Sequence, residues 1–263
     1  MKFAGLVRSL AVPFLALAVH LASAEPLDLV QSGKLTVATQ GTFPPFSMRT
    51  PDGQLDGLEI RVMREVARRL HLEYTPVLTQ WDALLVGLQA KKYDIISASM
   101  DITPERQKSI LFSDGWLESG GRVVTLKGSP IHSAADLKDK TVGALVSSTF
   151  AKLAIEHGAK LKSYRLETDA IQDLVNGTVD AVITDSISGA YVAEHLGLPV
   201  VMTADYVSHV QKGFAMRKDE RPLADAVDRA LADMVADGTY AKLTKGLLGY
   251  DPSPKDPIRT LPQ

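Results

Sequence analysis

The sequence predicts an α/β fold built around mainly parallel sheets. Short apolar segments alternate with segments whose apolar residues recur at helical spacing, and this alternation occurs twice along the chain. Several of the apolar segments end in serine, threonine or aspartate immediately before a helix. Because ligands of such sheets bind outside the carboxyl ends of the strands, these positions are the first candidates for a binding site.

The first series of elements begins at residue 35. Strands are expected at 35–39, 72–77 and 95–96, and helices at 58–70 and 81–90. The turn residues Pro51-Asp52-Gly53 indicate a hairpin tip. This βαβαβ order favours a parallel sheet covered by helices.

Residues 93–106 predict an anion-binding point at the end of a strand. The segment passes from Ile95-Ile96 through small polar residues to Thr103-Pro104-Glu105-Arg106, in which threonine is an N-cap and proline the first helical residue. Backbone N–H groups and the guanidinium of Arg106 would there hold a carboxylate or phosphate. The alternative is an ordinary capped helix in which Arg106 is solvated or paired with Glu105 or Asp114.

A second series starts after Gly120-Gly121. Strands are expected at 122–126, 141–145, 164–166 and 179–183, with helices at 133–137, 149–157, 170–176 and 186–196. A last strand at 213–216 precedes helices at 222–236 and 240–248. The strand ends near residues 38–41, 97–101, 146–149 and 184–185 would converge on one cleft if two lobes faced each other.

Composition excludes several classes of protein. The chain has 263 residues, 45% hydrophobic and 23% charged, which suffices for one large or two medium domains with apolar cores. A net charge of −2 gives no basic field for nucleic acid. The histidines show no ligand spacing, so we expect neither a metal site nor a cofactor.

The N-terminus predicts export. Lys2 and Arg8 precede an apolar run that ends near Leu21, and Ala22-Ser23-Ala24 follows, so residues 1–24 have the pattern of a signal peptide cleaved after Ala24. The chain contains no cysteine, hence neither disulfides nor a lipid anchor on cysteine. A periplasmic protein stabilised by its core is the expected result, with an uncleaved anchor as the alternative.

Taken in order, several segments resemble the family 3 solute-binding proteins, which serve polar amino-acid uptake by ABC transporters. The segments are Gly33-Lys-Leu-Thr-Val-Ala38, Phe43-Pro-Pro-Phe46, Trp81-Asp-Ala-Leu84, Ile102-Thr-Pro-Glu-Arg106, Phe112-Ser-Asp114 and Asp237-Gly-Thr-Tyr240. The resemblance implies a two-lobed periplasmic-binding-protein fold of type II with two hinge strands. It places lobe 1 at residues 25–119 plus 210–263 and lobe 2 at 120–209.

The resemblance also implies roles for residues in the cleft. Arg106 would clamp the α-carboxylate of an amino acid, with Ser99 and Thr149 donating to the same group. Asp185 would accept the α-ammonium, although it could also only cap the following helix. Phe43 and Trp81 would enclose the ligand side chain, unless they belong to the core. Ser97 completes the set on the loop at residues 97–101, called the first anion loop below; the loop at 146–149 is the second anion loop.

Three positions depart from the family pattern and affect the expected specificity. Asp101 stands where serine or threonine is common, and would either accept from a cationic ligand or brace Arg106. Gln40 replaces an acid that binders of cationic amino acids often carry, and Ser147 replaces a common glycine. With no second cation in the matched positions, a basic or polar amino acid is favoured over an acidic one.

The implied partners are an amino-acid ligand and an ABC permease, and we expect a monomer that is not an enzyme. A competing function is cyclohexadienyl dehydratase, whose Phe-Ser-x-Arg-Thr run is similar to residues 46–50. Its general-acid glutamate falls at Ser188, which cannot supply a titrating proton near neutral pH as a carboxyl can. Burial of Asp101 could provide a substitute acid. An opine-type binding module is a third possibility.

Overall fold

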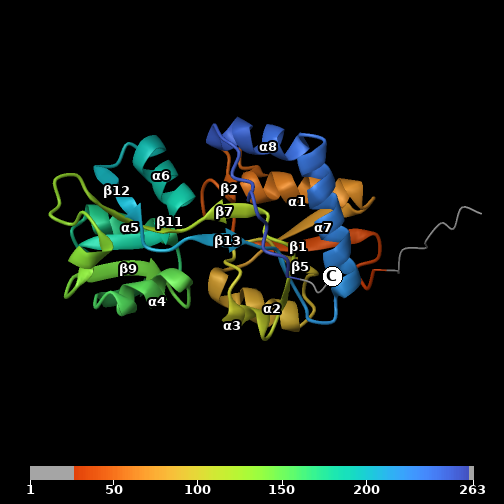
Figure 1. The fold of residues 1–263 in the computed structure, drawn as a ribbon, viewed down its shortest axis with the longest axis horizontal. Coiled ribbons are helices and arrows are strands. Elements are labelled where there is room, and N and C mark those ends of the chain that lie inside the picture. Colours follow the sequence, from red (N-terminus) through yellow and green to blue (C-terminus); the bar gives the residue numbers. More distant parts are fainter. Residues whose placement is uncertain (1–26, 261–263) are drawn as a thin grey trace, which may run out of the picture.

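The structure is a computed structural model that describes residues 27–260; the predicted signal peptide lies outside this range. Two lobes lie side by side, each with a five-stranded sheet flanked by helices (Figure 1). Lobe 1 is used below for the first sheet and its helices, and lobe 2 for the second sheet and its helices. None of the helices described is both long and apolar enough to cross a membrane.

The sheet of lobe 1 contains strands from both ends of the described chain. Its order is β4 (Glu73–Leu78), β1 (Lys34–Thr39), β5 (Ile95–Ile96), β14 (Ala215–Met216) and β6 (Leu111–Phe112). Only β14 runs against its neighbours, so the sheet is mainly parallel, as predicted. A hairpin of β2 (Met48–Arg49) and β3 (Leu55–Asp56) encloses the predicted turn.

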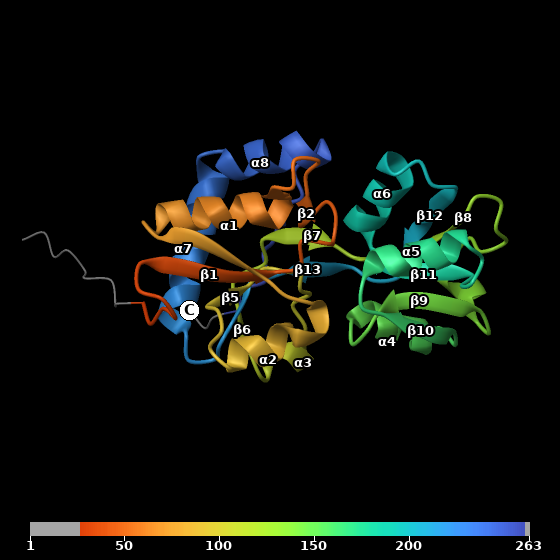
Figure 2. The same cartoon turned by 180° about the vertical axis from the view of Figure 1, so that it is seen from behind.

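Helices cover both faces of this sheet. One face carries α1 (Leu58–Arg69), α7 (Arg221–Ala236) and α8 (Thr239–Leu248); the other carries the 3₁₀ turn η1 (Trp81–Ala83), α2 (Leu84–Gln89) and α3 (Pro104–Gln107) (Figures 1 and 2). Because strand residues alternate between faces, Leu35 and Val37 of β1 pack with α1 and α7, whereas Ala38 packs with α2. The packing of β1 between the two layers of helices therefore determines the position of Gln40, the polar residue that follows the strand.

The sheet of lobe 2 has the same plan. Its order is β10 (Lys160–Tyr164), β9 (Thr141–Leu145), β11 (Ala181–Asp185), β8 (Gly121–Leu126) and β12 (Val200–Tyr206), and only β8 runs against its neighbours. The flanking helices are η2 (Ala134–Leu137), α4 (Thr149–Glu156), α5 (Glu167–Val175) and α6 (Ser186–His195). In lobe 2, the strand ends that were predicted to contact a ligand are those of β9 and β11, and they lead into α4 and α6.

Two antiparallel strands connect the lobes. β7 (Leu117–Ser119) pairs with β13 (Val210–Lys212), with Ser119 opposite Val210. The figures show this pair between the two sheets, which confirms the prediction of two hinge strands (Figures 1 and 2). The tail after α8 crosses the pair, because the N–H of Glu118 donates to the carbonyl of Pro252 over 2.8 Å.

Some predicted strand bounds were wrong. β10 begins four residues before the predicted 164–166, and β12 was not predicted. β11 was expected to end at Ile183, but it continues through Thr184 and Asp185, which are buried and pair with Arg122 and Gly121 of β8. Polar residues were assumed to end a strand, whereas here they find partners inside the protein.

Candidate functional site

The site lies between the lobes, where strand ends of both sheets meet. It encloses a cavity of about 20 Å³, lined by Gln40, Phe43, Trp81, Ala98, Ser99, Asp101, Arg106, Leu145, Ser148, Thr149 and Phe150. Seven of the lining residues were predicted from the sequence: Gln40, Phe43, Trp81, Ser99, Asp101, Arg106 and Thr149. A cavity of this size holds only about one water molecule, so the lobes are nearly closed on one another.

Arg106 is oriented by the start of α3. Thr103 caps this helix, and its hydroxyl accepts a hydrogen bond from the Arg106 N–H over 3.2 Å. The guanidinium lies over the ring of Trp81, 5.4 Å from the centroid, and Nη1 donates to the carbonyl of Asp101 over 2.9 Å. Burial lowers the pKa of Arg106 from its ordinary value, against the attraction of Asp101. The pKa of Arg106 nevertheless stays far above 7, so the guanidinium remains a cation at neutral pH.

The alternative pairings considered for Arg106 were wrong. Glu105 forms its ion pair with Lys108, and Asp114 forms its ion pair with Arg259. Arg106 therefore keeps four guanidinium N–H groups for which no partner is found among residues 27–260. A guanidinium fork held by one carbonyl and one aromatic ring is suited to a carboxylate.

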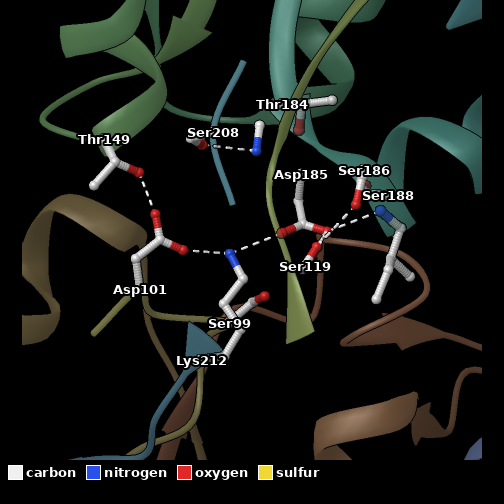
Figure 3. Close-up of polar contacts among 12 residues, drawn as sticks. Ser99, Asp101, Ser119, Thr149, Thr184, Asp185, Ser186, Ser188, Ser208 and Lys212 are labelled. Atoms are coloured by element: carbon white, nitrogen blue, oxygen red, sulfur yellow. Dashed lines mark hydrogen bonds and ion pairs between the residues drawn. The ribbon is translucent and has the colours of Figure 1, made fainter. Parts of the chain in front are cut away.

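The most buried charges of the site form a chain across the lobes. The ammonium of Lys212, in β13, contacts Asp101 Oδ1 and lies 2.7 Å from Asp185 Oδ2 (Figure 3). All three side chains are buried. Thr149 of α4 donates to the second oxygen of Asp101. The chain therefore joins the first anion loop, a hinge strand and the end of β11.

Lys212 was missed by the sequence analysis. Its own burial disfavours the ammonium, but the Coulombic attraction of Asp101 and Asp185 outweighs this and raises the pKa of Lys212. Burial likewise acts to raise the pKa of Asp101, yet Lys212 and Thr149 hold it below the ordinary value. The expectation that burial could make Asp101 an acid near neutral pH is therefore wrong. A lysine inside the apolar run 210–216 was the available signal, since such a charge needs buried partners.

Asp185 performs the capping role that was foreseen for it. Its Oδ1 accepts from the Ile187 N–H over 2.9 Å at the start of α6, and from the Ser119 hydroxyl over 2.7 Å. Oδ2 faces Lys212, without the alignment of a hydrogen bond to any of the described residues. Asp185 does not line the cavity; Lys212 lies between it and Asp101, which does (Figure 3).

The serine residues of the two anion loops differ in position. Ser97 and Ser99 are held in lobe 1 with hydroxyls that have no partner within the described chain. Ser147 is exposed and does not line the cavity, whereas the neighbouring Ser148 lines it and caps α4, accepting from the Ala151 N–H over 3.1 Å. Buried hydroxyls without partners are rare, and Ser99, which has one, lines the cavity.

Glu59 of α1 is hydrogen-bonded to the backbone of the first anion loop. Its Oε2 accepts the Ser99 N–H over 2.8 Å, and its Oε1 accepts from Thr39 over 3.0 Å. Ser99 has a φ of 49°, so its backbone is in the left-handed region and is held there by this carboxyl. Burial raises the pKa of Glu59 to about 8. The Ser99 N–H is thus already used, and the hydroxyl is the group that Ser99 offers to a ligand.

A second buried acid lies behind the cleft in lobe 2. Glu167, at the start of α5, contacts the hydroxyls of Thr184 and Ser188, the latter at 2.6 Å. Burial, more than the neighbouring charge of Asp185, raises the pKa of Glu167 to about 7. Sequence reasoning placed no acid beside Ser188, because Glu167 lies 21 residues away along the chain.

Besides the contacts at the hinge, which include those of Asp185 with Lys212 and Ser119, three polar contacts join the lobes in the described chain. They are Thr149 with Asp101, the Ser188 hydroxyl with the Pro44 carbonyl at 2.6 Å, and Arg165 with Asp82 at 3.1 Å. The first member of each pair belongs to lobe 2 and the second to lobe 1. These contacts describe a closed arrangement, in which a bound molecule would be enclosed by both lobes.

Comparison with known proteins agrees with this geometry. The histidine-binding periplasmic protein of Salmonella typhimurium (strain LT2) is 32% identical over 230 residues, which cover 83% of this chain and 88% of that protein. A solved ancestral arginine-binding protein bound to glutamine has a TM-score of 0.79 at 34% identity, covering 83% of this chain and 99% of that chain.

A further solved structure is the ancestral amino acid-binding protein AncCDT-1, a precursor of cyclohexadienyl dehydratase. It has a TM-score of 0.77 at 35% identity, and covers 82% of this chain and 96% of that chain. The family model of the bacterial extracellular solute-binding proteins, family 3, matches residues 35–249. That span includes both sheets and both hinge strands, and this chain belongs to the family 3 solute-binding proteins.

Proposed function

We propose that the protein is the receptor of an ABC importer and binds an amino acid between its lobes. The observation that carries this proposal is the presence of a guanidinium and of carboxylates at one small cavity between the lobes. Arg106 presents a guanidinium fork to the cavity; Asp101 also lines it, and Asp185 lies behind, joined to Asp101 by Lys212. A zwitterion needs an anion acceptor and a cation acceptor several ångströms apart; Arg106 supplies the first, and the carboxylates now paired with Lys212 supply the second.

The ligand side chain is proposed to be basic or polar. Gln40, Phe43, Trp81 and Phe150 line the cavity and supply one amide and three aromatic rings, which suit a flat or cationic side chain. Arg106 is proposed to bind the ligand α-carboxylate, and Lys212 is paired with Asp101 and Asp185, so neither cation is left for an acidic side chain. The similarity to a histidine-binding protein and to an arginine-binding protein bound to glutamine supports the same class.

Transport requires that the lobes open and close. We place the division at residues 25–119 plus 210–263 for lobe 1 and 120–209 for lobe 2, in agreement with the hinge strands at 117–119 and 210–212. A ligand that contacts both lobes binds the closed form more tightly, and thereby shifts the population toward it. The closed monomer would then dock on a membrane permease.

The proposed location is the periplasm. The periplasmic relative supports it, and so does the leader pattern of residues 1–24, with cleavage after Ala24. The test is the N-terminal sequence of the protein released by osmotic shock. A mature N-terminus at Glu25 is expected, and retention of Met1 in a membrane fraction would contradict the proposal.

We further propose that the protein is not an enzyme. Ser188 stands where the dehydratase would need a general acid, and Asp101 is kept ionised by Lys212. Glu167 is the remaining candidate acid, and it lies behind Ser188 instead of lining the cavity. The likeness to a precursor of cyclohexadienyl dehydratase is a likeness to a binding protein.

One experiment tests receptor against enzyme. Purified mature protein is screened by thermal shift against the common amino acids, opines and prephenate, and each hit is confirmed by calorimetry. A ligand that binds only the folded state stabilises it by about 2.7 kcal/mol at a hundredfold excess over Kd. Stabilisation by a basic or polar amino acid is expected. Stabilisation by prephenate alone, with turnover, would overturn the proposal.

A further inference from the structure

The ammonium of Lys212 is held by one carboxylate from each lobe. Asp101 follows β5 in lobe 1 and Asp185 ends β11 in lobe 2, and both contact Lys212 Nζ (Figure 3). In a third direction Nζ faces the ring of Phe150, 5.4 Å from its centroid. The ammonium is therefore surrounded, and no direction is left in which it could hold a ligand carboxylate as well.

The position of this ammonium matches the place expected for a ligand cation. Asp185 Oδ1 is used by Ser119 and by the backbone of α6, so Oδ2 is the oxygen that could accept from an incoming ammonium. Oδ2 is the atom that Lys212 covers. An α-ammonium in the cavity can reach Asp185 only if Lys212 gives up this contact.

Lys212 can leave Asp185 without losing all its partners. Residues 101 and 212 form an antiparallel backbone bridge, so Asp101 and Lys212 are held together by the main chain. Asp185 belongs to the other lobe. Retreat of Lys212 onto Asp101 alone leaves its charge paired, and frees one carboxylate for a second cation.

We propose that Lys212 is a tethered competitor of the ligand, occupying the ammonium subsite until an amino acid displaces it from Asp185. This rests on the proposed function. Because Lys212 contacts one carboxylate from each lobe, this cation itself favours closure, and because it covers Oδ2 of Asp185 it lowers the affinity for amino acids. A ligand must then gain enough from Arg106 and from its side-chain contacts to replace this cation, which makes Lys212 a determinant of selectivity.

The test uses a charge-conserving pair of substitutions. Lys212→Gln alone leaves two buried carboxylates facing each other and risks unfolding, so it is combined with Asp101→Asn. The substitution at position 101 does not alter the main-chain carbonyl that accepts from Arg106. Affinities for L-histidine, L-arginine and L-glutamine are measured by calorimetry, each beside the analogue that has hydrogen in place of the α-amino group.

The double variant is expected to bind the amino acid at least tenfold more tightly than wild type, with no gain for the analogue. Asp101→Asn alone is the matched control; Lys212 then keeps only Asp185, and affinity is expected to fall. An unchanged or weaker affinity in the double variant would overturn the proposal. Equal gains for the amino acid and its analogue would also overturn it, because Lys212 would then act on something other than the ammonium.

A second readout separates this proposal from the function it rests on. Without ligand, the double variant should have a larger radius of gyration in small-angle scattering, because its lobes have lost their common cation. If wild type binds none of the amino acids, the proposed receptor function fails and scattering still decides the role of Lys212. An unchanged radius in a folded double variant would overturn that role.

Discussion

The Ser188 hydroxyl of α6 lies 2.6 Å from the carbonyl oxygen of Pro44, which belongs to the other lobe. The same hydroxyl lies 2.6 Å from Oε2 of Glu167. A serine has one proton to donate, and a carbonyl can only accept. Both contacts are satisfied together when Glu167 is neutral and donates to Ser188. Protonation of a buried acid is therefore coupled to a bond between the lobes.

Replacing Ser188 by alanine removes this bond. A hydrogen bond contributes about 1 kcal/mol net, so Ser188→Ala should shift the balance of closed and open forms about fivefold toward open. Calorimetry should show a corresponding loss of affinity for a confirmed ligand. Ser163→Ala, at an exposed position of the same lobe, is the matched control. Equal affinities in the two variants would show that the bond does not contribute to closure.

The raised pKa of Glu167 predicts a stability that falls as the pH rises. The pKa is about 7 in the folded protein against 4.5 ordinarily, so the folded state holds the proton more tightly. The stabilisation is complete below the ordinary pKa and is lost between about pH 4.5 and pH 7, amounting to roughly 3 kcal/mol for this group. Urea unfolding at pH 5 and pH 8 measures the difference.

The glutamine variant isolates this contribution. In Glu167→Gln the amide can donate to Ser188 and accept from Thr184 at every pH, as the neutral acid does. The loss of stability between pH 5 and pH 8 should therefore be smaller than in wild type. Part of it should remain, because Glu59, with a pKa of about 8, titrates in the same sense. Glu194→Gln, exposed on α6, should leave the wild-type slope intact.

Arg106 is predicted to dominate recognition of the ligand carboxylate. Arg106→Ala would leave a desolvated carboxylate without its partner, at a cost on the order of 2–5 kcal/mol, and affinity should fall at least tens-fold. Arg106→Lys should recover only part of the loss, since an ammonium does not form a fork. The control is Arg229→Ala, on the exposed face of α7. Unchanged affinity in Arg106→Ala would refute the proposed orientation of the ligand.

The protein is expected not to convert prephenate. Without a carboxyl at position 188, general-acid assistance of roughly 10²–10⁴-fold is missing. Formation of phenylpyruvate should not exceed that in buffer, with a cyclohexadienyl dehydratase as positive control. Turnover that disappears in Glu167→Gln would contradict this and identify Glu167 as the acid.

The parts of the site that follow local sequence rules were predictable. Thr103-Pro104 begins a helix whatever surrounds it, and this sets the direction of Arg106. The alternation of strands and helices likewise determined that the polar residues after β5 and β9 would lie at the cleft. These features depend on a few consecutive residues, so they can be recognised without the fold.

The buried charges could not be predicted in this way. Lys212 acquires its environment from Asp101, 111 residues distant, and from Asp185 in the other lobe. Glu59 and Glu167 are buried acids, whereas most glutamates are exposed, so nothing in their own segments distinguished them. Asp101 was assigned two alternative roles, and the structure shows that its carbonyl braces Arg106 while its carboxylate pairs with Lys212. These partners are brought together only by the packing of the two lobes, so they could not be recognised from the local sequence.

The tail that crosses the hinge also protects it from other chains. A two-stranded ribbon such as β7–β13 has two open edges, and open edges promote association between molecules. The carbonyls of Pro252 and Ile258 accept the N–H groups of Glu118 and Gly115 at one edge, and the Ile102 N–H donates to the carbonyl of Gln211 at the other. Expression of a shortened chain that stops at Tyr250 would therefore yield a protein prone to aggregate through its hinge, even with both lobes intact.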